Sequence, residues 1–170
     1  MRISHLLAGF VFGMMATVAA GKQEKIPNNL IDYEGFLKDA TEVAKLREQR
    51  RVTEEAFIQM ARDPQTIVLD ARSEIGYRQF HIKGAKHLSL ADISASELAK
   101  IIPEKTTRIL IYCNNNFKND PALITKIDRA AINIYTFNML YSYGYTNVYE
   151  LGPVIDVTKT KLAFERPPRT

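Results

Sequence analysis

Residues 108–113 of the chain read Arg-Ile-Leu-Ile-Tyr-Cys, and this stretch decides the fold. A short, continuous apolar run is typical of a strand covered on both faces in a parallel sheet. Cys113, the only cysteine among 170 residues, directly follows that predicted strand. In open parallel sheets, ligands bind beyond the carboxyl ends of the strands. The position of Cys113 therefore makes it the first candidate for chemistry.

Predicted strands alternate with predicted helices on both sides of this stretch. We expect strands at residues 66–70, 86–88, 108–112 and 147–151, and helices at residues 36–49, at residues 129–143 and after the caps Thr53, Ser73 and Ser94. The last helix is expected to carry one stripe of Ala130, Ile134, Phe137 and Tyr141 and to end at a left-handed Gly144. Such alternation indicates an α/β layer architecture with a mostly parallel sheet.

The N-terminus has the pattern of a secretory signal peptide. Arg2 precedes the apolar residues 6–20, and small side chains at Val18 and Ala20 precede a polar stretch. The apolar run is shorter than the ~20 residues that span a bilayer. The sequence therefore predicts export to the periplasm or secretion, with no stable membrane insertion once the signal is removed.

Composition and charge exclude some classes of function. Charged residues make up 25% of the chain and hydrophobic residues 46%, which are ordinary globular values. The net charge is +4, but the one dense basic run, residues 45–51, lies among glutamates and is typical of a solvated helix face. A nucleic-acid partner is not expected.

The position of Cys113 alone leaves two interpretations open. The thiol can be inert and buried in the core, where it behaves as a small hydrophobic group. Alternatively, the following Asn-rich loop, CNNNFKND, can turn its N–H groups toward the sulfur as an anion nest. A helix that starts nearby would add its dipole. In that setting we expect a lowered thiol pKa and a nucleophilic thiolate.

Four segments of the chain resemble the rhodanese (sulfurtransferase) family in order and spacing. They are IVLDARS (67–73), YRQFHIKGAKHL (77–88), ILIYC (109–113) and YGYTNVYEL (143–151). The resemblance implies a three-layer α/β/α fold with a five-stranded parallel sheet. It also implies that Cys113 is the sulfur-accepting cysteine. The expected cradle and substrate-binding residues are Asn114, Asn115, Asn116, Phe117, Lys118 and Asn119.

Other residues of the matching segments are expected to be structural. Asp70 and Arg72 fit the family's Asp-x-Arg pattern, which ties a strand end to its neighbours. His81 fits a turn and is expected to be a hydrogen-bonded structural histidine, and no partner is expected for His87. One cysteine and two distant histidines do not suit a zinc site, so no metal and no other cofactor are expected.

The sequence departs from the family after Cys113 and after the last strand. Cys113 and Gly144 are 31 positions apart, over a dozen more than is usual, with the extra residues around 120–128. This insertion is either a lid over the thiol or a tolerated surface loop. Residues 152–153 are Gly-Pro where paired glycines are usual. Phosphatases of the same fold need Cys-x5-Arg, and Asn119 stands at the arginine position.

The resulting hypothesis is an exported sulfurtransferase. Cys113 would carry sulfur as a persulfide from a thiosulfate-like anion to a thiophilic acceptor such as cyanide or a thiol. A non-catalytic rhodanese-fold module that binds a partner protein, and a thiol redox protein using Cys113, are the alternatives. The expected division of the chain is a signal peptide at 1–20, a lead-in and helix at 21–51, a rhodanese-like domain at 52–160 and a tail at 161–170.

We predict that export removes residues up to about Ala20, because the charged start, apolar run and small-residue exit follow the order that signal peptidase requires. N-terminal sequencing of protein isolated from its native host measures the cleavage point. An intact Met1 in the membrane fraction would show an anchor instead of a signal.

Overall fold

The computed structural model describes residues 26–166, and the predicted signal segment at residues 1–20 lies outside them. Within the described range, residues 32–166 form one compact unit, and residues 26–31 belong to another. In the smaller unit, the Ile31 N–H donates to the carbonyl of Asn28 across a turn (3.4 Å). Among residues 26–166, no helix is long and apolar enough to cross a bilayer.

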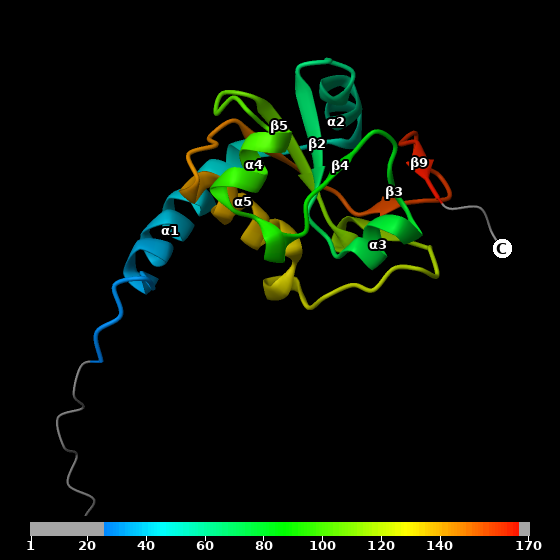
Figure 1. Ribbon diagram of the computed structural model, residues 1–170. Helices are drawn as coiled ribbons and strands as arrows, with labels where there is room; N and C mark the ends of the chain where they lie inside the picture. Colours follow the sequence, from blue (N-terminus) through cyan, green and yellow to red (C-terminus); the bar gives the residue numbers. More distant parts are fainter. Residues whose placement is uncertain (1–25, 167–170) are drawn as a thin grey trace, which may run out of the picture. The chain divides into compact units, whose positions relative to one another are not determined.

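The larger unit is built on a five-stranded sheet, as the sequence predicted (Figure 1). Its strands, in spatial order, are β1 (Arg51–Val52), β7 (Val148–Leu151), β5 (Arg108–Tyr112), β2 (Thr66–Asp70) and β4 (Lys86–His87). Each pair of neighbours is parallel. The strand that precedes Cys113, β5, is thus the central strand. The cysteine therefore lies at a position in the sheet with neighbouring strands on both sides.

Helices cover both faces of this sheet. They are α1 (Tyr33–Arg50), α4 (Ala95–Ile101) and α5 (Ile132–Ser142) on one face, and α2 (Glu54–Ala61) and α3 (Glu74–Gln79) on the other. Successive residues of β5 point to opposite layers: Ile109 and Ile111 pack with the first group, and Leu110 and Tyr112 with the second. Because both faces are covered, the strand is apolar after its first residue, Arg108, and the three-layer prediction is confirmed.

Side-chain caps start three of the helices at the predicted positions. Thr53, Ser73 and Ser94 each accept a hydrogen bond from the backbone N–H three residues further on. Gly144, after α5, has φ +84°, a left-handed conformation that glycine adopts without the steric cost of a Cβ atom.

The helix after the insertion differs from the prediction. Residues 128–130 form a separate 3-10 turn, η3 (Asp128–Ala130), and the extended Ala131 precedes α5 at Ile132. The predicted stripe is also partly wrong, since Ile134 is 37% exposed while Asn133 and Thr136 are buried. The spacing of hydrophobic residues predicted the wrong buried face because the polar amide side chain of Asn133 is buried there.

Short strands outside the main sheet tie down the loops. β3 (His81–Ile82) pairs antiparallel with β9 (Phe164–Glu165), which lies within the stretch assigned as a tail. β6 (Phe117–Lys118) pairs with β8 (Ile155–Asp156), so the chain leaving Cys113 is anchored before the insertion begins. The 3-10 turns η1 (Leu90–Asp92) and η2 (Asn114–Asn116) complete the order of elements.

Candidate functional site

Cys113 lies immediately after β5, at the carboxyl edge of the sheet, in an extended conformation. The residue is 1% exposed, so its thiol is enclosed and does not lie in an open loop mouth. Burial alone would be consistent with an inert core cysteine. The groups around the sulfur distinguish the two interpretations.

Three backbone N–H groups near the Cys113 thiol favour its thiolate form and so act to lower its pKa. They belong to Asn115 in the Cys loop and to Ile132 and Asn133 at the start of α5. Unpaired N–H groups and the positive end of the helix dipole both favour negative charge at this point. The sulfur therefore lies in a partial anion cradle, which an inert core cysteine does not need.

Two of these donors come from outside the residues singled out in the sequence. The insertion carries the chain away after Phe117 and returns it at Ile132, so the cradle combines two segments far apart in sequence. The expectation that a helix begins near the thiol could have indicated the start of α5. The start of α5 was not recognised as part of the site because a dozen extra residues separate it from the Cys loop.

The thiol pKa does not follow the expectation from the sequence. Burial raises the pKa of Cys113 above its ordinary value, and the negative charge of Glu150 adds to this. The backbone N–H groups of Asn133, Asn115 and Ile132 act to lower the pKa, but their effect is smaller than that of burial. The predicted lowered pKa is thus wrong, because desolvation of the thiolate outweighs three backbone dipoles.

The side chains of the three asparagines after Cys113 hold the loop through hydrogen bonds to different parts of the chain. Asn116 Oδ1 accepts from the N–H of Cys113 (2.9 Å), and its Nδ2 donates to the carbonyl of Leu151 (2.6 Å). Asn114 and Asn115 reach across to the insertion, where their Nδ2 atoms donate to the carbonyls of Ile124 (2.8 Å) and Lys126 (2.7 Å). The insertion is therefore strapped to the Cys loop itself.

Phe117, Lys118 and Asn119 have other surroundings. Phe117 is buried among aromatic rings, in edge contact with Tyr112. Lys118 is exposed in β6, and Asn119, at φ +65°, donates from Nδ2 to Asp156 (2.9 Å). These contacts anchor β6 against β8, and none of the three residues lines the hollow next to Cys113.

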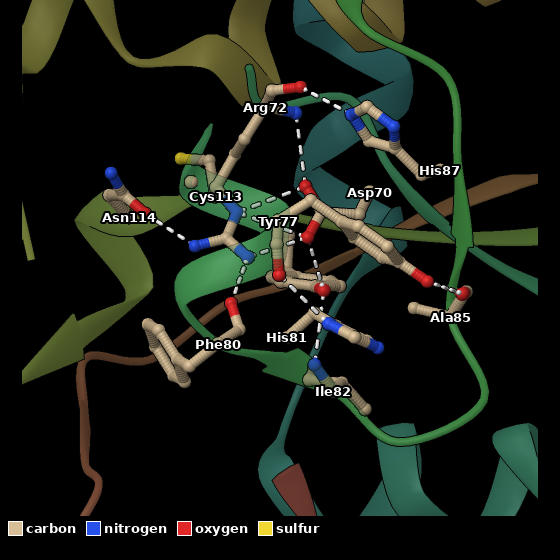
Figure 2. Close-up of polar contacts among 12 residues, drawn as sticks. Asp70, Arg72, Tyr77, Phe80, His81, Ile82, Ala85, His87, Cys113 and Asn114 are labelled. Atoms are coloured by element: carbon tan, nitrogen blue, oxygen red, sulfur yellow. Dashed lines mark hydrogen bonds and ion pairs between the residues drawn. The ribbon is translucent and has the colours of Figure 1, made fainter. Parts of the chain in front are cut away.

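On the other side of the Cys loop, Asp70 and Arg72 form a buried ion pair (Figure 2). Arg72 donates through Nε and Nη2 to the carboxylate, through Nη2 to the carbonyl of Phe80 (2.6 Å), and through Nη1 to Asn114 Oδ1 (2.7 Å). The Tyr112 hydroxyl donates to Asp70 Oδ2 (2.6 Å). The structural role expected for the Asp-x-Arg pattern is confirmed.

The two histidines of this region flank Tyr77. Both imidazoles stack on its ring, His81 at 3.8 Å and His87 at 4.6 Å between centroids. His81 Nδ1 is bonded to the Tyr77 carbonyl (2.9 Å), as a structural histidine would be, and His87 Nε2 to the carbonyl of Arg72 (2.9 Å). His87 thus has a partner that the sequence did not reveal. Within residues 26–166, no group of three His, Cys, Asp or Glu side chains could hold a metal ion.

A cavity of about 590 Å³ lies beside the Cys loop, between the start of α3, η1, the start of α5 and the insertion. Asn115 and Ile132, whose N–H groups hold the thiol, line it. Ala122, Ile124 and Lys126 of the insertion form another wall. A hollow of equal volume near β1 and β8 contains none of the expected site residues.

Comparison with known proteins agrees with this geometry. The rhodanese-like domain family matches residues 53–152, more than half of the chain. The chain belongs to the rhodanese-like family. No curated protein is significantly similar to it. The segment matched by the family begins at residue 53, after α1.

Solved rhodanese structures are similar in fold. A rhodanese-like domain from Anabaena sp. is 18% identical, with 71% of this chain and 83% of that chain covered and a TM-score of 0.51. An E. coli rhodanese with anions is 19% identical over 60% and 99% of the two chains (TM-score 0.42). A polysulfide-sulfur transferase homodimer from Wolinella succinogenes is 15% identical over 75% and 93% (TM-score 0.38).

We predict that the alkylation rate of Cys113 by iodoacetamide will rise with pH to an inflection above that of a free thiol, about 8.5, because burial disfavours the thiolate. Since the chain has one cysteine, the wild-type protein gives an unambiguous signal. The same protein in denaturant is the control. A folded-state inflection at or below the denatured one would contradict the prediction.

Proposed function

We propose that the protein is a sulfurtransferase that carries sulfur as a persulfide on Cys113. The observation that carries this proposal is the position of the one cysteine: Cys113 directly follows the central strand of a rhodanese-like chain. N–H groups of Asn115, and of Ile132 and Asn133 at the start of α5, favour its thiolate. Negative charge on a sulfur at this point is stabilised by fixed dipoles that need no reorganisation during the reaction.

The reaction has two nucleophilic steps. The Cys113 thiolate attacks the outer sulfur of a thiosulfate-like donor, and the bond from that sulfur to the sulfite sulfur breaks, so sulfite leaves with the electron pair. An acceptor thiolate or cyanide then attacks the outer sulfur of the persulfide, and Cys113 leaves as a thiolate. Sulfur is transferred without net oxidation, and no cofactor takes part.

The raised thiol pKa is compatible with this chemistry. A thiol of higher pKa has a smaller thiolate fraction at neutral pH, but its thiolate is intrinsically more nucleophilic. The N–H groups of Asn115, Ile132 and Asn133 keep the cost of forming the anion below that of burial alone. The raised pKa thus lowers the fraction of thiolate at neutral pH but increases the reactivity of the thiolate that forms.

We further propose that acceptors approach through the cavity beside the Cys loop. Its volume of about 590 Å³ suits an organic molecule and far exceeds what cyanide requires. Apolar side chains from η1, α5 and the insertion face it, and Lys126 adds a positive charge. These walls favour a thiol that has an apolar body over a small hydrophilic one.

We predict that thiosulfate treatment will add about 32 Da to the wild-type protein, reversible by a mild thiol, because one sulfur joins Cys113. Cys113→Ser should show no addition and no transfer activity. Its stability should change by at most about 1 kcal/mol, since a hydroxyl can accept the same N–H bonds.

Intact-mass spectrometry, a transfer assay and thermal unfolding of the same two proteins measure these outcomes. An adduct of about 16 Da would indicate oxidation to a sulfenic acid instead. A wild-type protein that takes up no sulfur would be a rhodanese-fold binding module and would overturn the proposal.

We predict that Ile124→Asp will lower the transfer rate to an apolar thiol such as hexanethiol roughly threefold to tenfold, because it places a charge in an apolar wall. The rate with cyanide should change much less. Ile127→Asp is the matched control, because Ile127 lies in the same insertion and is similarly exposed (67% against 75%) but does not line the cavity. Equal effects of the two substitutions would exclude the cavity as the acceptor route.

A further inference from the structure

Arg47, on α1, forms a two-point ion pair with Glu150 of β7. Its Nε lies 2.5 Å from Oε2, and its Nη2 lies 2.8 Å from Oε1. Glu150 is only 5% exposed, and such a buried carboxylate requires a counter-charge. The counter-charge comes from a helix that ends at Arg50, before the segment matched by the rhodanese-like family begins at residue 53.

Glu150 is linked to the sulfur cradle through Asn133. The Nδ2 of Asn133 donates to Glu150 Oε1 (3.3 Å) and to Asn116 Oδ1 (2.9 Å), while its backbone N–H favours the thiolate of Cys113. Asn116 Oδ1 in turn accepts from the N–H of Cys113 (2.9 Å). One continuous set of hydrogen bonds therefore runs from Arg47 to Cys113 through three elements of the fold.

Charges of opposite sign face the thiol from this side. Burial is the largest cause of the raised pKa of Cys113, and the negative charge of Glu150 adds to it. The pKa of Arg47 is raised mainly by its hydrogen bond to Glu150, with a smaller contribution from a negative Cys113. From the other side Arg72 reaches the Cys loop at Asn114, but Asp70 neutralises it. The start of α5 contributes backbone N–H groups and no acidic side chain.

We propose that Arg47 is a positioning residue of the sulfur site: by neutralising Glu150 it holds Asn133 and Asn116 in place around Cys113, and it makes α1 part of the active site. Without Arg47, the carboxylate would be buried, unpaired and adjacent to the sulfur. The proposal deepens the sulfur transfer proposed above and rests on it for its biological meaning. Its test does not depend on sulfur transfer.

The test is the pH profile of Cys113 alkylation in full-length variants. Arg47→Met leaves the Glu150 charge uncompensated, so at pH 7.5 alkylation should slow roughly threefold to tenfold and the inflection should move up. Glu150→Gln leaves the positive charge alone, so alkylation should speed up by a similar factor and the inflection should move down. The double variant should return close to the wild-type profile.

Arg50→Met is the matched control. Arg50 is on the same helix and also reaches the end of β7, where it lies over the ring of Tyr149 (4.4 Å) and donates to Asn147 (3.3 Å). It has no bond to Glu150, so a merely structural role of α1 would make both arginine variants alike. The proposal requires Arg50→Met to keep the wild-type inflection.

Thermal unfolding of each variant shows whether it is folded at the assay temperature. If Arg47→Met does not fold, Glu150→Gln still decides the question, because the arginine that it leaves without a partner is partly exposed (27%). An unshifted profile for Glu150→Gln, or for a folded Arg47→Met, would overturn the proposal. If the profiles shift as expected but thiosulfate adds no sulfur to Cys113, sulfur transfer fails and the positioning role stands.

Discussion

The ion pair between Asp70 and Arg72 joins the carboxyl ends of the two central strands and holds the loop that carries the cysteine. Its members are 0% and 3% exposed. Asp70 also accepts from the Tyr112 hydroxyl at the end of β5. Arg72 donates to Asn114 immediately after Cys113 (Figure 2). Removing either member would leave a buried charge unpaired, at a cost of about 3–5 kcal/mol. The position of the thiol therefore depends on this pair.

Opposing effects act on the thiol, and burial is the largest of them. Enclosure of Cys113 disfavours a thiolate, and Glu150 adds to this, while three N–H groups favour it. In an uninterrupted Cys loop the donors would be consecutive. Here the insertion separates Asn115 from Ile132, so the cradle depends on how the insertion is strapped back through Asn114 and Asn115. The insertion is therefore coupled to the sulfur site in addition to forming a cavity wall.

Sequence patterns predicted the regular parts of this fold because their signals are local. The run at residues 108–112 and the caps Thr53, Ser73 and Ser94 each determine their element within a few positions. The start of α5 was misplaced because an inward-facing Asn133 reads as a surface residue when neither its partner Glu150 nor the thiol is adjacent in sequence. The thiol pKa was misjudged for a related reason. Burial is a property of the assembled layers, and no single segment reveals it.

Two ion pairs flank the Cys loop, which itself contains no arginine. Asp70–Arg72 lies on the side of β2, and Arg47–Glu150 on the side of β7. Each pair is neutral as a unit, although Glu150 still disfavours the Cys113 thiolate, and backbone N–H groups favour it. A phosphatase of the same fold needs a free arginine to grip a doubly charged phosphate. A persulfide carries a single negative charge, and a cradle of N–H groups between two neutral pairs is suited to that smaller demand.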